Sequence, residues 1–99
     1  MSERQPMTHV LKCVEPFYGR VADRSKLFEV RRDDRDFQPG DTVVLRKFDG
    51  RFYGNSYCVF GIGYVLRGFP GLNRFYCAFS LLDPTDQDDD RADAAMGIT

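Results

Sequence analysis

Alternating apolar and polar residues recur along this chain and predict a protein built mainly of strands. The first such stretch, residues 8–14, alternates at every position and is rich in residues that favour strands. Successive side chains of a strand point to opposite faces, so each face collects every second residue. One face carries His9, Leu11 and Cys13, and the other carries Val10, Lys12 and Val14. We therefore expect the first strand here, after a flexible arm at residues 1–7.

The same alternation returns in residues 25–32, which read SKLFEVRR. Phe28 and Val30 share one face of this predicted strand, and Glu29 and Arg31 share the opposite face. Between the two strands, apolar residues fall four positions apart and Pro16 suits a first helical position, which predicts a short helix over residues 16–24. A polar loop, DDRDFQPGD, follows the second strand.

The second half of the chain predicts three or four more strands. Residues 42–48 form one, and the Asp-Gly pair that follows is a strong signal for a two-residue hairpin leading into residues 51–53. Residues 56–66 form a long β-rich stretch in which Gly61 and Gly63 suggest a bulge or tight bend. Residues 75–82 supply the last strand.

This order of elements predicts an α+β fold that is mostly β, with five to six strands and one early helix. Short strands joined by hairpins in so small a chain favour closure into a barrel over an open sheet with bare edges. The length of 99 residues allows one domain, which we place at residues 8–82.

Charge divides the chain into a basic body and an acidic end. Residues 1–82 contain thirteen Lys or Arg against nine Asp or Glu, whereas residues 83–99 contain one Arg against six Asp. We expect residues 83–99 to be a disordered acidic tail. The first ten residues contain no apolar run, and no stretch is long enough to span a bilayer, so we expect a cytoplasmic protein that does not enter membranes.

Several chemistries find no support in the sequence. The three cysteines form no CxxC pair, and His9 is the single histidine, so neither a disulfide framework nor a metal site is predicted. Gly61-Ile62-Gly63 is too short for a phosphate-binding glycine loop, and no serine has the flanking glycines of a nucleophile elbow. We expect no cofactor, a structural His9, and cysteines that act as small buried hydrophobic residues.

A dense ionic segment, residues 26–41, contains the strongest candidates for a binding site. Glu29 and Arg31 project from one face of a strand, where a carboxylate and a guanidinium can hold each other beside a cleft. Lys26 lies at the other parity and would reach that cleft from the turn before the strand. Lys12 would meet them if the first two strands are neighbours. The alternative is a solvated strand edge with weak ion pairs.

This segment resembles the ASCH superfamily, a PUA-like group with a GxKxxExR motif after its first helix. Residues 24–31, RSKLFEVR, match that motif except that Arg24 replaces the glycine. The chain is more closely similar to an ASCH-related family of unknown function that is common in phages and bacteria. The matching features are His9-x-Leu11-Lys12, Lys26-x-Phe28-Glu29-x-Arg31, Asp34-Arg35-Asp36-Phe37, Gly40-Asp41 and YVLRGFPGL, with Asp33 in place of the usual Asn. The likeness covers residues 8–82 and implies a PUA-like barrel.

PUA-like domains generally bind RNA, so the resemblance implies a cleft for single-stranded RNA or a modified nucleoside. The implied cleft residues are Lys12, Lys26, Glu29 and Arg31. Further basic residues could attract RNA, namely Arg20, Arg24, Arg35, Arg46, Lys47 and Arg51. Exposed aromatic residues such as Tyr18, Tyr53 or Tyr57 could stack on bases, although each could equally belong to the core.

Two other functions stay open. Some ASCH proteins are small amidohydrolases that remove an acyl group from a modified cytidine with a Lys, a hydroxyl residue and a Glu, which makes Lys26 and Glu29 the catalytic candidates. Here Glu29 stands where those enzymes have a threonine, and no later Glu follows it. The third hypothesis is that the chain is an accessory protein of a phage or mobile element and works through contacts with an unidentified protein.

Overall fold

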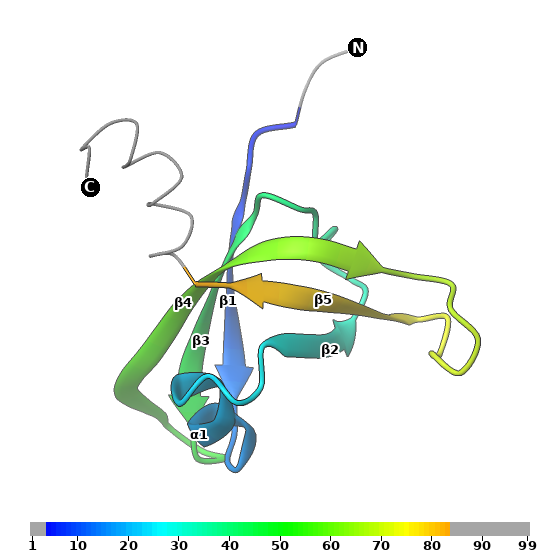
Figure 1. Ribbon diagram of the computed structural model, residues 1–99. Helices are drawn as coiled ribbons and strands as arrows, with labels where there is room; N and C mark the ends of the chain where they lie inside the picture. Colours follow the sequence, from blue (N-terminus) through cyan, green and yellow to red (C-terminus); the bar gives the residue numbers. More distant parts are fainter. Residues whose placement is uncertain (1–3, 84–99) are drawn as a thin grey trace.

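The computed structural model describes residues 4–83, which form five strands and one short helix (Figure 1). In chain order these are β1 (Thr8–Cys13), α1 (Phe17–Ala22), β2 (Phe28–Arg32), β3 (Thr42–Phe48), β4 (Tyr53–Leu66) and β5 (Tyr76–Leu82). Apart from Asp83, the expected acidic tail lies outside the described residues. Within the described part of the chain, no helix is long and apolar enough to cross a membrane.

All five strands belong to one sheet, in the order β1-β3-β4-β5-β2. β1 runs parallel to β3, and every other neighbouring pair is antiparallel. The sheet curls into a half-barrel whose outer strands, β1 and β2, approach each other without pairing (Figure 1). The predicted mostly β fold, a small barrel with one early helix, is therefore confirmed, and the barrel stays open between β1 and β2.

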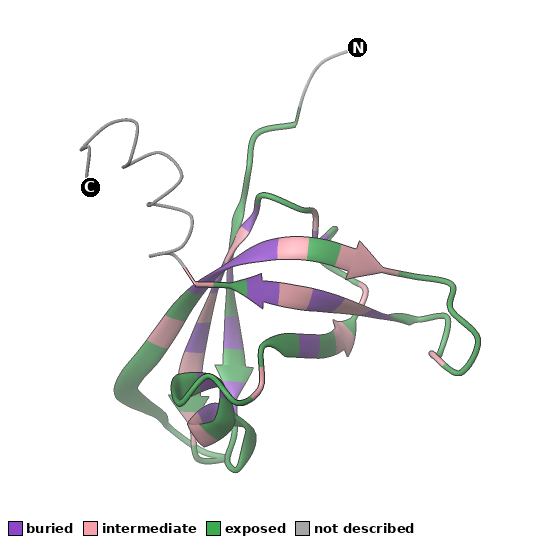
Figure 2. Cartoon of the chain, in the orientation of Figure 1, coloured by how far each residue is buried: buried purple, intermediate pink, exposed green. Residues whose placement is uncertain are grey.

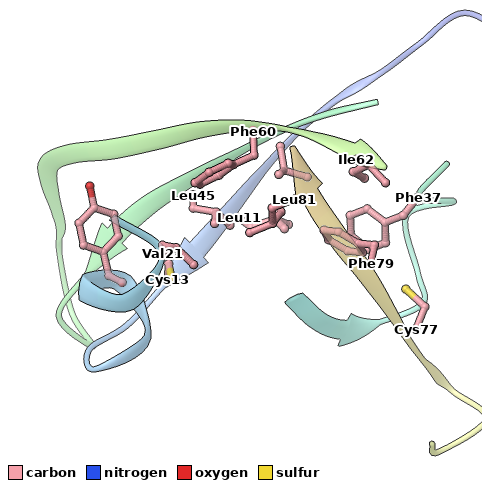
Figure 3. Packing of buried hydrophobic residues seen from close by; sticks show 12 residues of the cluster. Leu11, Cys13, Val21, Phe37, Leu45, Phe60, Ile62, Cys77, Phe79 and Leu81 are labelled. Carbon is pink, nitrogen blue, oxygen red and sulfur yellow. The ribbon is translucent and has the colours of Figure 1, made fainter. Parts of the chain in front are cut away.

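The concave side of the curled sheet holds the hydrophobic core (Figures 2 and 3). β1 and β5 bury every second residue, as their alternating sequences predicted. α1 adds Tyr18 and Val21, and Phe37 enters from the loop between β2 and β3. The remaining core residues are Leu11, Cys13, Val43, Leu45, Phe60, Ile62, Cys77, Phe79 and Leu81. β2 contributes no apolar side chain to this core, because its buried residue is Glu29.

β4 is one long bent strand where the sequence predicted two, at residues 51–53 and 56–66. Its pairing with β5 shifts register between Ile62 and Val65, which confirms the bulge predicted there. A Cβ atom at Gly63 would lie 2.7 Å from Ser80 Oγ, so a side chain at this position would force a neighbour to move. The glycine lets two strands approach closely at the bend.

The connection between β3 and β4 is a loop of four residues, and not the two-residue hairpin that the Asp-Gly pair predicted. Asp49 Oδ1 accepts hydrogen bonds of 2.8 Å from the backbone N–H groups of both Arg51 and Phe52. Gly50 has a φ of 104°, which a glycine adopts without strain. The carboxylate of Asp49 thus stabilises a wider turn than the sequence pattern indicated.

Asp41 is a buried carboxylate that ties the N-terminal segment to the barrel. Its two oxygens accept hydrogen bonds from Arg4 at 2.9 Å each, and from the backbone N–H groups of Met7 and Gln38 at 3.0 and 3.2 Å. His9 Nε2 lies 2.8 Å from Oδ2, so the expectation that His9 is structural agrees with its contacts. Burial alone would raise the pKa of Asp41, but these donors outweigh it and hold that pKa well below its usual range.

We expect Asp41→Asn to lower the free energy of unfolding by about 3 kcal/mol at neutral pH, because the buried donors lose their charged acceptor. The pKa of Asp41 is lowered on folding, so its stabilisation is present above the unfolded-state value near pH 4 and is lost as the pH falls below it. Urea denaturation of both proteins from neutral pH down to about pH 2 should show the stability difference narrowing in acid. A difference that stays constant over this range would contradict the assignment.

Candidate functional site

A cleft of about 460 Å³ opens in the gap between β1 and β2. Its walls come from the end of β1, the start of α1, the turn before β2, and β2 itself. The residues that line it are Lys12, Cys13, Val14, Phe17, Lys26, Phe28, Glu29, Val30 and Arg31. This lining contains all four residues that were expected to form a cleft, namely Lys12, Lys26, Glu29 and Arg31.

Side chains, and not strand pairing, bridge the gap. An unpaired strand edge carries backbone carbonyls that need hydrogen-bond donors. Arg31 Nη2 donates to the carbonyl of Lys12 at 2.8 Å, which joins β2 directly to β1. Arg35 Nη1 donates to the carbonyl of Val10 at 3.1 Å, and Lys26 Nζ donates to the carbonyl of Phe28 at 2.8 Å. The open edge is therefore lined with cations.

Glu29 forms the centre of the cleft. Its Oε2 accepts a hydrogen bond from Lys26 Nζ at 2.7 Å, and its Oε1 accepts one from Arg31 Nε at 2.8 Å. The side chain of Glu29 is 4% exposed, whereas those of Lys26 and Arg31 are 19% and 24% exposed. Lys26 reaches Glu29 from the turn before β2, as its parity predicted. The carboxylate of Glu29 is therefore a buried hydrogen-bond acceptor with a cation on each side.

Aromatic and aliphatic side chains form the walls of the cleft. Phe28 and Val30 lie on the outward face of β2 and are 52% and 49% exposed, while Phe17 at the start of α1 is 51% exposed. The ammonium of Lys26 lies 4.8 Å from the ring centre of Phe28 and 5.8 Å from that of Phe17. Phe17 and Phe28 were not among the residues predicted to line the cleft.

Two residues that line the cleft, Lys12 and Cys13, offer a ligand less reactive groups than the ion pairs around Glu29 do. The ammonium of Lys12 lies 4.7 Å from the ring centre of Phe48, and its backbone carbonyl already accepts the hydrogen bond from Arg31, so Lys12 lines the cleft mainly with its side-chain stem. Cys13 is buried, and burial together with the nearby charge of Glu29 raises the pKa of its thiol to about 11. A thiol with so high a pKa is a poor nucleophile at neutral pH.

The turn between α1 and β2 positions Lys26, and Arg24 lies at its most constrained point. Arg24 has a φ of 70°, a backbone region that favours glycine. Its side chain donates to Asp83 at 2.9 Å and to the carbonyl of Ala22 at 3.0 Å, and its guanidinium lies over the ring of Phe60. These contacts offset the backbone strain.

The other basic candidates are spread over the surface, and one of them, Arg35, joins the open edge. Arg20 lies 3.8 Å from Asp23, and Lys47 lies 3.6 Å from Glu15. Arg46 and Arg51 stack on aromatic rings and are not part of the cleft.

Of the three tyrosines considered for base stacking, Tyr18 is excluded. It is buried in the core, and burial together with its contact to Cys58 raises the pKa of its hydroxyl to about 12. Tyr53 and Tyr57 are exposed. The predicted burial of cysteines holds for Cys13 and Cys77, and all three thiols are free. Within residues 4–83, no three His, Cys, Asp or Glu side chains lie close enough to hold a metal ion.

We expect the Arg24→Gly variant to be more stable than the Arg24→Ala variant by about 1 kcal/mol. Both variants lose the contacts of the guanidinium, but only glycine relieves the left-handed backbone conformation. Thermal unfolding and urea denaturation of the two proteins side by side would measure this difference. An alanine variant as stable as the glycine variant would show that the backbone of this turn is not strained.

We expect Glu29→Gln to lower the free energy of unfolding by about 2 kcal/mol, because Lys26 and Arg31 are left close together without their shared counter-charge. Asp34→Asn makes the same change of charge at an exposed position of the following loop and should change stability by less than about 0.5 kcal/mol. Urea denaturation compares the two. Equal effects would mean that the ion triad contributes nothing specific to the fold.

Comparison with known proteins places the chain in a family without assigning it an activity. No curated protein matches the sequence. One family pattern, the domain of unknown function DUF3850, matches residues 8–81. The match begins in β1 and ends in β5, so it covers the curled sheet except Leu82 and includes every residue that lines the cleft. On this evidence the chain belongs to the DUF3850 family of domains of unknown function.

Proposed function

We propose that this domain binds an unpaired base of single-stranded RNA, or a modified nucleoside, in the cleft between β1 and β2. The observation that carries the proposal is the Glu29 carboxylate, held between Lys26 and Arg31 inside a cleft with aromatic and aliphatic walls. The proposal rests on the polarity and shape of this site. It is supported by the resemblance of RSKLFEVR to the ASCH motif, and an ASCH-like, PUA-like origin is part of the proposal.

A nucleobase combines the features that this cleft would recognise. Its flat faces suit the rings of Phe17 and Phe28, and its exocyclic amino group could donate a hydrogen bond to Glu29. Lys26 and Arg31 offer donors to a base carbonyl or to a phosphate at the rim. A volume of about 460 Å³ lies in the range of ordinary small-ligand sites.

The residues that line the cleft are better suited to binding a nucleoside than to hydrolysing one. An amidohydrolase of the kind considered above needs a hydroxyl beside its lysine, and none of the residues that line the cleft carries one. Cys13 does not replace it, because its raised pKa keeps the thiol protonated at neutral pH. Removal of an acyl group from a modified cytidine is therefore the second candidate, and contact with a protein partner is the third.

Binding of single-stranded RNA is tested by fluorescence anisotropy over a series of salt concentrations. The wild type should bind an unstructured oligonucleotide with an affinity that falls as salt rises. The Lys26→Ala/Arg31→Ala double variant should lose this binding. The Glu29→Gln variant is the sharper test, because it makes the protein more positive yet should weaken binding about tenfold: the charged carboxylate with two acceptor oxygens becomes an amide with one acceptor oxygen and one NH2 donor.

The Asp34→Asn variant is the matched control, because it removes the same negative charge outside the cleft. It should bind RNA as tightly as the wild type or slightly more tightly. Tighter binding by both variants would mean general attraction to RNA and would refute a specific cleft. Absence of binding by the wild type to RNA and to nucleosides would refute the proposal altogether. Incubation with acylated cytidine, followed by mass spectrometry, would reveal the hydrolytic alternative.

A further inference from the structure

A second surface, on the outer face of β1, β3 and β4, has the character of a binding platform. Strand register places three valines in one row across these strands, at Val10, Val44 and Val59. The next row consists of Lys12, Arg46 and Tyr57. These residues alternate with the core residues of the same strands, so they face away from the hydrophobic core.

This outer face is hollowed and largely uncovered. A depression of about 390 Å³ lies on it, lined by Val10, Val44, Arg46, Gly54, Asn55 and Tyr57. Tyr57 is 62% exposed, and Val10 is 48% exposed. The depression is separate from the cleft, because the two share no lining residue.

Arg46 is held in place by a ring and keeps its hydrogen-bond donors available. Its guanidinium lies 4.1 Å from the ring centre of Tyr53, which is close enough for a cation–π interaction. It makes no hydrogen bond or ion pair with any other described residue, whereas Arg4, Arg31 and Arg67 each donate to a carboxylate. Asn55 likewise has no side-chain hydrogen bond within the described part of the chain. Oriented, unpaired donors of this kind suit an anionic ligand.

The charge of the platform is of one sign. β1, β3 and β4 contain no Asp or Glu at any position, whereas Lys12 and Arg46 of their outer face are cationic. A face with tyrosine rings, oriented guanidinium donors and no carboxylate resembles the stacking surfaces on which proteins bind single-stranded nucleic acid. The same features fit a second copy of this chain poorly, because identical faces would bring Arg46 and Lys12 of each copy toward like charges.

We propose that the outer face of β1, β3 and β4 binds a second nucleotide of the strand whose base occupies the cleft. This inference rests on the proposed function. A base stacks on Tyr57 within the depression, Arg46 donates to its phosphate or its edge, and Asn55 offers an amide to the base. Lys12 links the two places, because it lines the cleft and is the register neighbour of Arg46. Adjacent strands lie about 5 Å apart, so a few nucleotides of extended chain can span both places.

The test compares a nucleoside monophosphate, which can fill one place, with a single-stranded RNA of about ten nucleotides, which can fill both. The wild type should bind the longer RNA at least about tenfold more tightly. Arg46→Gln and Tyr57→Ala should each weaken binding of the longer RNA about tenfold and leave binding of the monophosphate unchanged. Glu29→Gln should weaken binding of both ligands. Circular dichroism checks that each variant is folded.

Arg74→Gln is the matched control for Arg46→Gln. Arg74 also stacks on an aromatic ring, at 4.8 Å from the ring centre of Phe75, but it lies in the loop between β4 and β5. Its loss should weaken RNA binding less than about twofold. An equal loss in the two variants would show that the platform contributes only general charge, and would overturn the inference.

The outcomes separate failure of the platform from failure of the cleft. If Arg46→Gln and Tyr57→Ala bind the longer RNA like wild type while Glu29→Gln does not, the platform is refuted and the cleft stands. If the wild type binds no RNA, both are refuted. Photocrosslinking of thiouridine-containing RNA, with mass spectrometry of the peptides, gives an independent check. Crosslinks at Tyr53 or Tyr57 support the platform, whereas crosslinks confined to residues 17–31, or a dimer that Tyr57→Ala dissociates, overturn it.

Discussion

The barrel stays open between β1 and β2, and the chemistry of the domain depends on how that opening is satisfied. Backbone carbonyls at a sheet edge need donors, and an edge without them invites unwanted pairing. Here Arg31 and Arg35 of the β2 side donate to carbonyls of β1, while Lys26 donates to a carbonyl of β2 itself. Long cationic side chains close the opening less tightly than a strand would, and the space they leave is the cleft.

β2 differs from the other strands in the kind of residue that it turns toward the core, and this difference shapes the site. Each of the other four strands turns apolar residues to the core, but β2 turns Glu29 inward and leaves Phe28 and Val30 exposed. A buried carboxylate is costly unless it is paired, so Lys26 and Arg31 are required beside it. The exposed aromatic surface becomes a wall of the cleft. One strand thereby supplies both the polar centre and an apolar side of the site.

Among the described residues, the carboxylates of Asp41 and Glu29 are buried, and they differ in how fully their surroundings satisfy them. Asp41 accepts hydrogen bonds from two side chains and two backbone N–H groups, with its side chain fully enclosed, which suits a structural role. Glu29 has two donors, both on long side chains that remain partly exposed, and it faces a cavity. Oxygen atoms with unused lone pairs at a cavity wall can accept a hydrogen bond from a ligand.

Periodicity in the sequence was enough to predict β1, β2, β3 and β5, the early helix, the shared face of Glu29 and Arg31, and the approach of Lys26 from the turn, whereas the long β4 was predicted as two strands. These features are local, because spacing along a strand decides which side chains share a face. Contacts between distant segments decided the features that the sequence did not predict. These are the open gap, the ion pair between Arg4 and Asp41, the burial of Tyr18, and the position of the Lys12 ammonium over Phe48. The sequence pattern by itself does not determine which face of a strand meets the core, since that depends on how the whole sheet curls.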